Sequence, residues 1–291
     1  MAQWLLLGCD GCGFGVGIVM HLVGCDFSSA PSRRKPIMLA HGHLRGAVLV
    51  LDRLEPLQTL EDFSAWLSRA DPWVGGFDLP FGLPRELLQT LGWPLEWEAS
   101  IRHFSTLSRE EIRAKFKVFC DARPVGAKFA HRACDRPAGS SPSMKWVNPP
   151  VAFMLHAGVP RMLNAGVSFP GLQASSGPHI ALEAYPGLLA REVLGQRSYK
   201  SDDRAKQTPE RLIARKDLIH ALEAGQTRLG LRLKLKPAQQ DSLVADASGD
   251  ALDAVLCLLQ AAWALHQHDL GHACYGLPAD MDPVEGWIVS A

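Results

Sequence analysis

The chain has 291 residues, and its 30 basic and 30 acidic side chains balance to a net charge of zero. This balance excludes a protein that binds nucleic acid through overall positive charge, so any such surface must be local. No uncharged apolar run is long enough to predict a membrane span, and seven scattered cysteines, an odd number, indicate reduced thiols and a cytoplasmic location.

The N-terminal segment differs from the rest of the chain. It is apolar and glycine-rich, Asp10 interrupts it, and it lacks the basic start of a signal peptide. Met20 is followed directly by "HLVGCDFSSAP", which is typical of a first strand. We therefore expect residues 1–19 to be a non-native or disordered extension and residues 20–291 to form a single domain.

Five short apolar runs are typical of buried strands and are separated by turns and helical patterns. The first three follow one another closely, which favours an antiparallel meander. The next segment begins at Thr59 and carries Asp62 three positions later, a variant of the capping box that predicts a helix over residues 59–70. The predicted strands are residues 21–26, 35–42, 46–54, 72–78 and 179–186.

A large insertion separates the fourth and fifth predicted strands, at about residues 85–178. Residues 121–150 form a predicted long loop, and loops of this length are usually functional or disordered. The overall order predicts an α/β fold, in which a mixed sheet carries helices on both faces. The predicted helices beyond residue 84 are 85–92, 108–119, 151–165, 186–195, 209–225 and 248–265.

Acidic residues lie at the ends of several predicted core elements. Asp26, Asp78 and Glu183 end strands, while Asp250 and Asp253 share one face at the start of the last long helix. If the three strands are parallel, these acids converge at the carboxyl edge of the sheet, where ligands gather in open α/β folds. Clustered carboxylates need protons or cations, and Mg²⁺ and Mn²⁺ prefer such oxygen ligands.

Each acid also has a purely structural interpretation. The helix dipole alone favours Asp250 and Asp253 in a first turn, and Asp26 and Asp78 precede turns that they can shape. The combination favours a site for one or two divalent ions, which can stabilise the attacking water and the leaving oxygen of a phosphodiester. Such chemistry needs no nucleophilic side chain, and no Ser–His–Asp or Cys–His arrangement is obvious in the chain.

Five segments resemble the predicted RNase H-like nuclease family, a domain of unknown function (family 429). They are "GCDFSSAP", "GGFDLPFGLP", "ALEAYPGLLAREVLG…SYK", "SGDALDAVLCLLQAAWA" and "EGWI", and the resemblance covers residues 21–290. It implies an RNase H-like mixed sheet of order 3-2-1-4-5 and a metal-dependent nuclease. By this resemblance Asp26, Asp78, Asp250 and Asp253 hold Mg²⁺ or Mn²⁺, and Glu183 matches the glutamate of the fifth strand.

Basic and aromatic residues alternate in the insertion and after residue 195. Basic groups suit phosphate and aromatic faces suit bases, so these segments are candidates for nucleic-acid contact. His131 is a candidate to orient water or to protonate a leaving oxygen. The expected substrate-binding residues are Arg123, Lys128, Arg132, Lys145, Tyr199 and Lys200.

These observations predict a metal-dependent nuclease in which the five acids and His131 are catalytic. Two alternatives stay open. A phosphotransferase on the same fold would use ATP and a phosphate-binding loop at "DFSSAPSRR", although no duplicated second lobe is evident. A non-catalytic adaptor for nucleic acid or protein would keep the fold without the chemistry.

Overall fold

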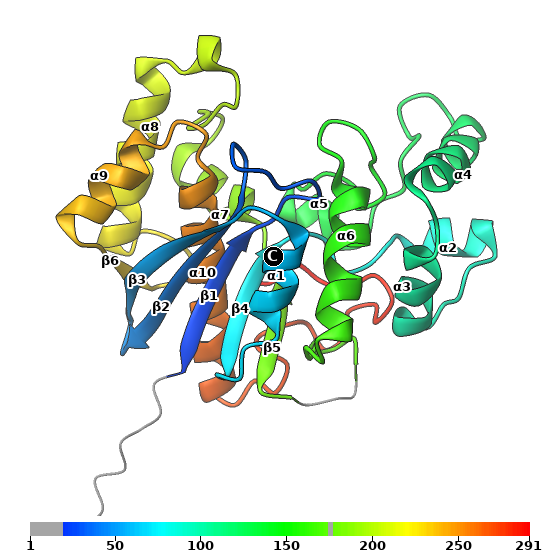
Figure 1. Cartoon of the computed structure of the whole chain (residues 1–291), viewed down its shortest axis with the longest axis horizontal. Coiled ribbons are helices and arrows are strands. Elements are labelled where there is room, and N and C mark those ends of the chain that lie inside the picture. Colours follow the sequence, from blue (N-terminus) through cyan, green and yellow to red (C-terminus); the bar gives the residue numbers. More distant parts are fainter. Residues whose placement is uncertain (1–19, 174–176) are drawn as a thin grey trace, which may run out of the picture.

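The computed structural model describes residues 20–173 and 177–291, so the predicted extension at residues 1–19 lies outside the described part of the chain. A mixed sheet crosses the molecule, and helices cover both of its faces (Figure 1). Its strands are β1 (His21–Asp26), β2 (Ile37–Arg45), β3 (Val48–Leu57), β4 (Trp73–Asp78), β5 (His179–Glu183) and β6 (Arg232–Lys234).

The sheet confirms the predicted meander, because β1 pairs antiparallel with β2, and β2 pairs antiparallel with β3. β1, β4 and β5 are parallel neighbours. The full order is β5-β4-β1-β2-β3-β6, which differs from the predicted order 3-2-1-4-5 by a sixth strand that pairs in parallel with β3. β6 has three residues, with two exposed basic side chains around one buried leucine, so it is too short to show a strand pattern in the sequence.

The helices match the predicted pattern in most places, and Thr59 and Asp62 form the predicted capping box. Two helices were not predicted inside the insertion, α3 and the single-turn α5. The helices are α1 (Leu60–Leu67), α2 (Arg85–Leu91), α3 (Trp97–Ser105), α4 (Arg109–Asp121), α5 (Asp135–Ala138), α6 (Val151–Asn164), α7 (Pro186–Leu194), α8 (Pro209–Ala224), α9 (Pro237–Ala245) and α10 (Asp250–Asp269), with a 3₁₀ turn η1 (Arg204–Lys206).

Two hydrophobic cores lie on opposite faces of the sheet. Val23 and Cys25 of β1 belong to the core that contains α1 and the insertion helices α2, α3, α4 and α6. Leu22 belongs to the second core, which contains α7, α8 and α10. Successive side chains of a strand point to opposite faces, so residues 22–25 of β1 carry no polar side chain because both faces of the strand are buried there.

Two glycines allow α10 to lie directly on the sheet. A Cβ at Gly24 of β1 would stand 2.0 Å from the Ala254 carbonyl oxygen, and a Cβ at Gly76 of β4 would stand 2.4 Å from the Cys257 carbonyl oxygen. No side chain fits in that space, so only glycine permits the backbone of the helix to approach this closely. The close approach fixes the start of α10 near the carboxyl ends of β1 and β4.

The chain between β4 and β5 holds α2 to α6 and forms the lobe at the right of Figure 1, while α8 and α9 form the lobe at the left. The predicted loop at residues 121–150 contains only α5 beyond the end of α4. Trp97 at the start of α3 is buried and donates a hydrogen bond from Nε1 to the Phe81 carbonyl at 2.7 Å, which ties the insertion to the segment after β4. Among the described residues, no helix is long and apolar enough to cross a membrane.

Candidate active site

The carboxyl ends of β1 and β4 bring Asp26 and Asp78 together as predicted. The two residues are register partners on parallel neighbouring strands, whose backbones are roughly 4.8 Å apart. Each lies two positions after a glycine that faces α10, and side chains two residues apart point to the same face. Both carboxylates therefore face the first turn of α10, which carries Asp253.

Asp26 and Asp78 have no hydrogen-bond or ion-pair partner among the residues that the structure describes. Burial, and next the charge of Asp253, raise the pKa of Asp78 to about 7. The same two causes, followed by the charge of Asp78, raise the pKa of Asp26 well above its usual range. Carboxylates that are desolvated and close to other negative charges favour a bound proton or a bound cation. Near neutral pH these two carboxylates are therefore suited to release a proton and bind a cation in its place.

Asp253 is fully buried and has two partners from the segment that follows α7. The Tyr199 hydroxyl donates to Oδ1 and the Lys200 ammonium donates to Oδ2. Burial lowers the pKa of Lys200, but the charges of Asp253, Asp26 and Asp78 outweigh it and raise the pKa above its ordinary value. The sequence predicted substrate contacts for Tyr199 and Lys200, whereas the structure places both on a predicted metal ligand.

Asp250 lies at the margin of this cluster. Burial raises its pKa, and the charge of Lys35 acts against that rise. Lys35 itself forms an ion pair with Asp202 at 2.6 Å. Ala251 N–H donates to the Asp246 carboxylate at 3.0 Å, so the helix start is capped by Asp246 and not by Asp250. Asp250 therefore makes no capping contact, although it lies in the first turn, where the helix dipole favours an acid.

Glu183 lines a pocket together with Asp78, but its carboxylate pairs with residues outside the aspartate cluster. Its two carboxylate oxygens accept from Arg132 Nη1 and Nη2 at 2.7 and 2.6 Å, a bidentate pair in which both side chains are buried. Its Oε2 also accepts the Phe81 N–H at 2.8 Å. The predicted catalytic glutamate and the predicted substrate-binding arginine are therefore paired with each other in this structure.

The same buried network includes two acids that the sequence analysis did not single out. Arg132 also bonds Asp135 Oδ1 through Nε and Nη2, at 3.1 and 2.9 Å. Glu285 accepts the backbone N–H groups of Arg85 and Ala133 at 2.7 and 2.8 Å. The network joins the insertion, the end of β5 and the C-terminal segment, which gives the motif "EGWI" a structural role.

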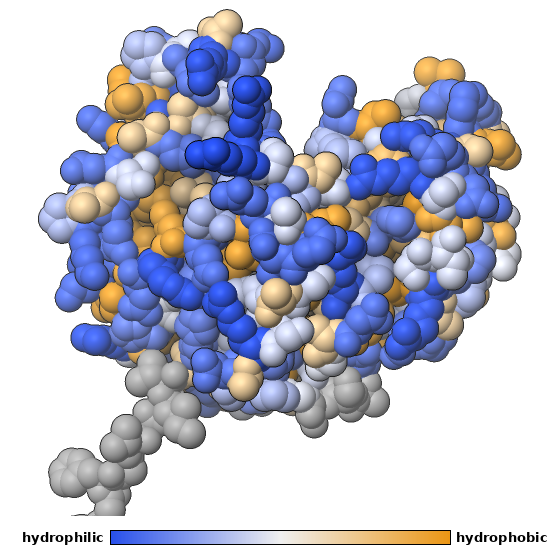
Figure 2. All heavy atoms as spheres, in the orientation of Figure 1, coloured by the Kyte–Doolittle hydropathy of each residue, from blue (hydrophilic) through white to orange (hydrophobic). Residues whose placement is uncertain are grey.

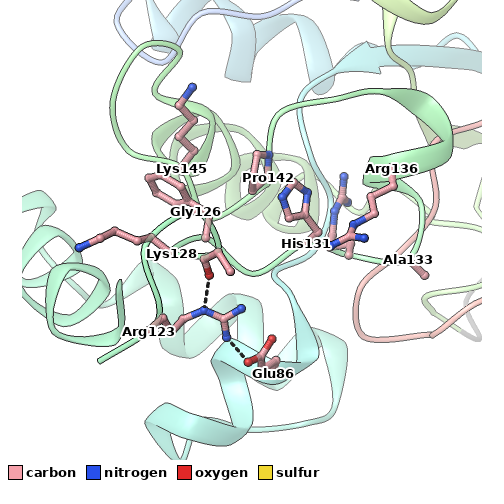
Figure 3. Close-up of a pocket in the computed structure, with 12 residues that line it drawn as sticks. Glu86, Arg123, Gly126, Lys128, His131, Ala133, Arg136, Pro142 and Lys145 are labelled. Carbon is pink, nitrogen blue, oxygen red and sulfur yellow. Dashed lines mark hydrogen bonds and ion pairs between the residues drawn. The ribbon is translucent and has the colours of Figure 1, made fainter. Parts of the chain in front are cut away.

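The remaining basic candidates line a pocket of about 730 Å³ in the insertion (Figure 3). Arg123 pairs with Glu86 and bonds the Ala127 carbonyl at 2.8 Å, while His131 and Arg136 lie next to each other on the other side. Lys128 stands 3.9 Å from Asp121 and points away from that pair. The pocket's ionisable lining residues are Glu86, Arg123, Lys128, His131, Arg132, Arg136 and Lys145.

Arg132 lies between this basic pocket and the acidic cluster, since it also lines a second pocket of about 240 Å³ together with Asp78, Glu183 and Lys200. The surface is hollowed between the lobe of α8 and α9 and the lobe of the insertion, and hydrophilic side chains occupy both rims (Figure 2).

No three His, Cys, Asp or Glu side chains of the described residues are arranged as a metal-binding group. Of the predicted acids, Glu183 pairs with Arg132, and Asp253 pairs with Tyr199 and Lys200. Asp26, Asp78 and Asp250 keep oxygen donors of the kind that Mg²⁺ and Mn²⁺ prefer. The Lys200 ammonium already lies against one of these carboxylates, so the chemistry of the donors suits a cation once Lys200 leaves Asp253.

A local pattern in the sequence accounts for this geometry. Both acid-bearing strands read Gly-x-Asp, at Gly24–Asp26 and at Gly76–Asp78. In a strand this spacing places a glycine, which has no side chain, and a carboxylate on the same face. A helix can then pack closely over the glycine, and its first turn lies beside the acid. The pairings of Lys200 and Arg132 had no such local signal.

No family model, no curated protein and no solved structure matches this chain. The resemblance to the RNase H-like nuclease family therefore stays a prediction.

Proposed function

We propose that the chain is a metal-dependent nuclease of RNase H-like fold and that Asp26, Asp78, Asp250 and Asp253 hold one or two Mg²⁺ or Mn²⁺ ions. The observation that carries the proposal is the pair of unpartnered, desolvated carboxylates at the ends of two parallel strands, facing the first turn of α10. A divalent ion, when bound, supplies Lewis-acid stabilisation of the phosphate charge and lowers the pKa of the attacking water.

The residues of the chain contribute positioning and charge to this chemistry. The sheet fixes Asp26 and Asp78 side by side, and the close packing of α10 fixes Asp253 against them. The basic pocket supplies the sequence-independent part of nucleic-acid affinity, which comes from neutralised phosphates. His131 lines that pocket and is the candidate to protonate a leaving oxygen.

In this proposal Arg132 and Glu183 support the site rather than react in it. Their buried, bidentate pair holds the insertion against the end of β5 and so sets the basic pocket beside the aspartates. A phosphate that bound Arg132 directly would have to compete with two buried carboxylates, Glu183 and Asp135.

The test is a Mn²⁺ titration against branched, hybrid and single-stranded nucleic acids with Asp26→Asn, Asp78→Asn and an Asp241→Asn control. Asn keeps the size of Asp but loses the charge, so we expect the first two variants to lose on the order of 100-fold or more in cleavage rate. Asp241 is exposed on α9, and its variant keeps the rate of the unaltered protein.

Three results would count against the proposal. Thermal stabilisation by ATP, with no cleavage of any substrate, indicates the phosphotransferase alternative. Tight nucleic-acid binding without metal-dependent cleavage indicates the adaptor. Cleavage at an unchanged rate by both Asp26→Asn and Asp78→Asn removes the aspartate cluster from the reaction.

A further inference from the structure

Lys200, in the segment between α7 and α8, places one positive charge in the aspartate cluster. Lys200 Nζ pairs with Asp253 Oδ2, and its aliphatic stem lies across Gly249, the residue before α10. A Cβ at Gly249 would stand 2.7 Å from Lys200 Cβ and 3.0 Å from Cδ. The helix start is therefore shaped to let this lysine reach the acids.

A single ammonium group cannot neutralise the whole cluster. Lys200 pairs with Asp253 alone, while Asp26, Asp78 and Asp250 have no partner within the described residues. Lys200 is the cation whose charge acts on both Asp26 and Asp78. It therefore occupies the electrostatic position that a divalent ion would take, with half of that ion's charge.

The Lys200 side chain also has space next to it into which it can move away from Asp253. Its side chain is 41% exposed, although the Asp253 side chain is fully buried. It lines two pockets that Asp78 also lines, one of about 240 Å³ with Glu183 and one of about 250 Å³ with Arg191 and Arg197. A lysine stem is long and flexible, and the ammonium regains hydration when it moves into the pocket with Glu183, whereas two guanidinium groups line the other pocket.

We propose that Lys200 is a displaceable counter-ion: its ammonium occupies the aspartate cluster in the metal-free protein and moves out when a divalent cation binds. The inference rests on the proposed metal site. Tyr199, which donates to the other oxygen of Asp253, keeps that carboxylate in place during the exchange.

Affinity for Mn²⁺, measured by calorimetry on the full chain, tests the proposal. Lys200→Met keeps the aliphatic stem on Gly249 and removes the competing charge, so we expect its Kd for Mn²⁺ to fall by on the order of tenfold or more. Lys206→Met is the matched control, because Lys206 follows in the same connection but is exposed and pairs with Asp203 at 3.4 Å. It keeps the Kd of the unaltered chain.

The outcomes separate this inference from the function on which it rests. If neither the unaltered chain nor Lys200→Met binds Mn²⁺, the proposed metal site is wrong. If both bind Mn²⁺ with the same Kd, or if the variant binds more weakly, the site stands and the role of Lys200 is wrong.

A second measurement uses the unaltered protein and does not depend on the folding of a variant. The reactivity of Lys200 toward an amine-directed reagent is followed by mass spectrometry as Mg²⁺ is added, with Lys206 as the internal standard. Displacement exposes the Lys200 ammonium, so its labelling rate rises several-fold relative to Lys206. A ratio that stays constant or falls on saturation with Mg²⁺ overturns the proposal.

Discussion

At Asp78, the proposed chemistry and the stability of the fold impose opposite demands. A carboxylate that lacks a partner and faces the charge of Asp253 is costly to ionise, and burial adds to that cost. The same two conditions are what attract a divalent cation. The metal-free protein is therefore expected to carry its proposed active site at the expense of its own stability.

Asp78→Asn should stabilise the metal-free protein increasingly as the pH rises. The unfolded Asp78 ionises near its ordinary pKa of about 4, whereas the folded one has a pKa of about 7. A raised folded pKa stabilises the fold fully below pH 4, and this contribution is lost as the pH rises through 7. The variant does not titrate, so its free energy of unfolding relative to the unaltered chain grows by up to about 4 kcal/mol between pH 4 and pH 8.

Urea denaturation in EDTA at a series of pH values measures this difference. Asp241→Asn, on the exposed surface of α9, is the control and gives a difference that does not change with pH. A flat difference for Asp78→Asn as well would contradict the burial and charge repulsion inferred for this carboxylate.

The residues of the site were predictable from sequence to different degrees. Asp26, Asp78 and Asp253 were identified because their positions follow from where elements begin and end. Glu183 was identified by the same rule, but its partner Arg132 lies 51 positions earlier in an irregular loop. Nothing local in the sequence records such a pairing, and the same holds for Lys200 and Asp253, which are 53 positions apart.

Among the elements, α10 and the sheet determine the geometry of the site through backbone contact. Gly24 and Gly76 leave no side chain between the strands and the helix. The position of Asp253 therefore depends on direct backbone contact, in which no side chain can change its rotamer to absorb a shift. The sequence predicted a helix at residues 248–265, and α10 spans Asp250–Asp269. It did not predict how closely the helix lies on the sheet, because packing distance depends on both surfaces together.

Gly24→Ala should therefore damage the fold more than an ordinary glycine substitution. The new methyl group meets the backbone of Ala254 and Leu258, which cannot rotate away, so we expect a loss of about 3 kcal/mol or more in the free energy of unfolding. Gly166→Ala is the comparison, because the space around Gly166 is open and only its positive φ of 73° is unfavourable, at a cost of about 1–2 kcal/mol.

Urea denaturation followed by tryptophan fluorescence compares the two alanine variants. Equal losses would show that α10 shifts outward without cost, and the close approach would then not constrain Asp253.

At the scale of the whole molecule, the buried network around Arg132 joins three distant parts of the chain. Arg132 comes from the insertion, Glu183 ends β5, and Glu285 lies in the C-terminal segment. An α/β sheet with a large insertion was predictable from the order of the elements. How the insertion attaches was not, since ion pairs between distant loops leave no periodic pattern in the sequence.

Arg132→Met should destabilise the protein strongly, because it leaves the buried Glu183 and Asp135 carboxylates without their cation. Loss of one partner of a buried pair costs about 3–5 kcal/mol. Arg136→Met provides the control, since Arg136 is exposed in the same pocket and its loss leaves no buried charge. We expect that control to change the free energy of unfolding by no more than about 0.5 kcal/mol.

The double variant Arg132→Met/Glu183→Met distinguishes a pairing role from a general packing role. If the cost of Arg132→Met comes from the stranded Glu183 charge, removal of that charge restores part of the lost stability, and the double variant is more stable than the single one. If Arg132 contributes through packing alone, the two losses add, and the double variant is the least stable of the series. Urea denaturation at neutral pH measures all four proteins of the cycle, the fourth being Glu183→Met.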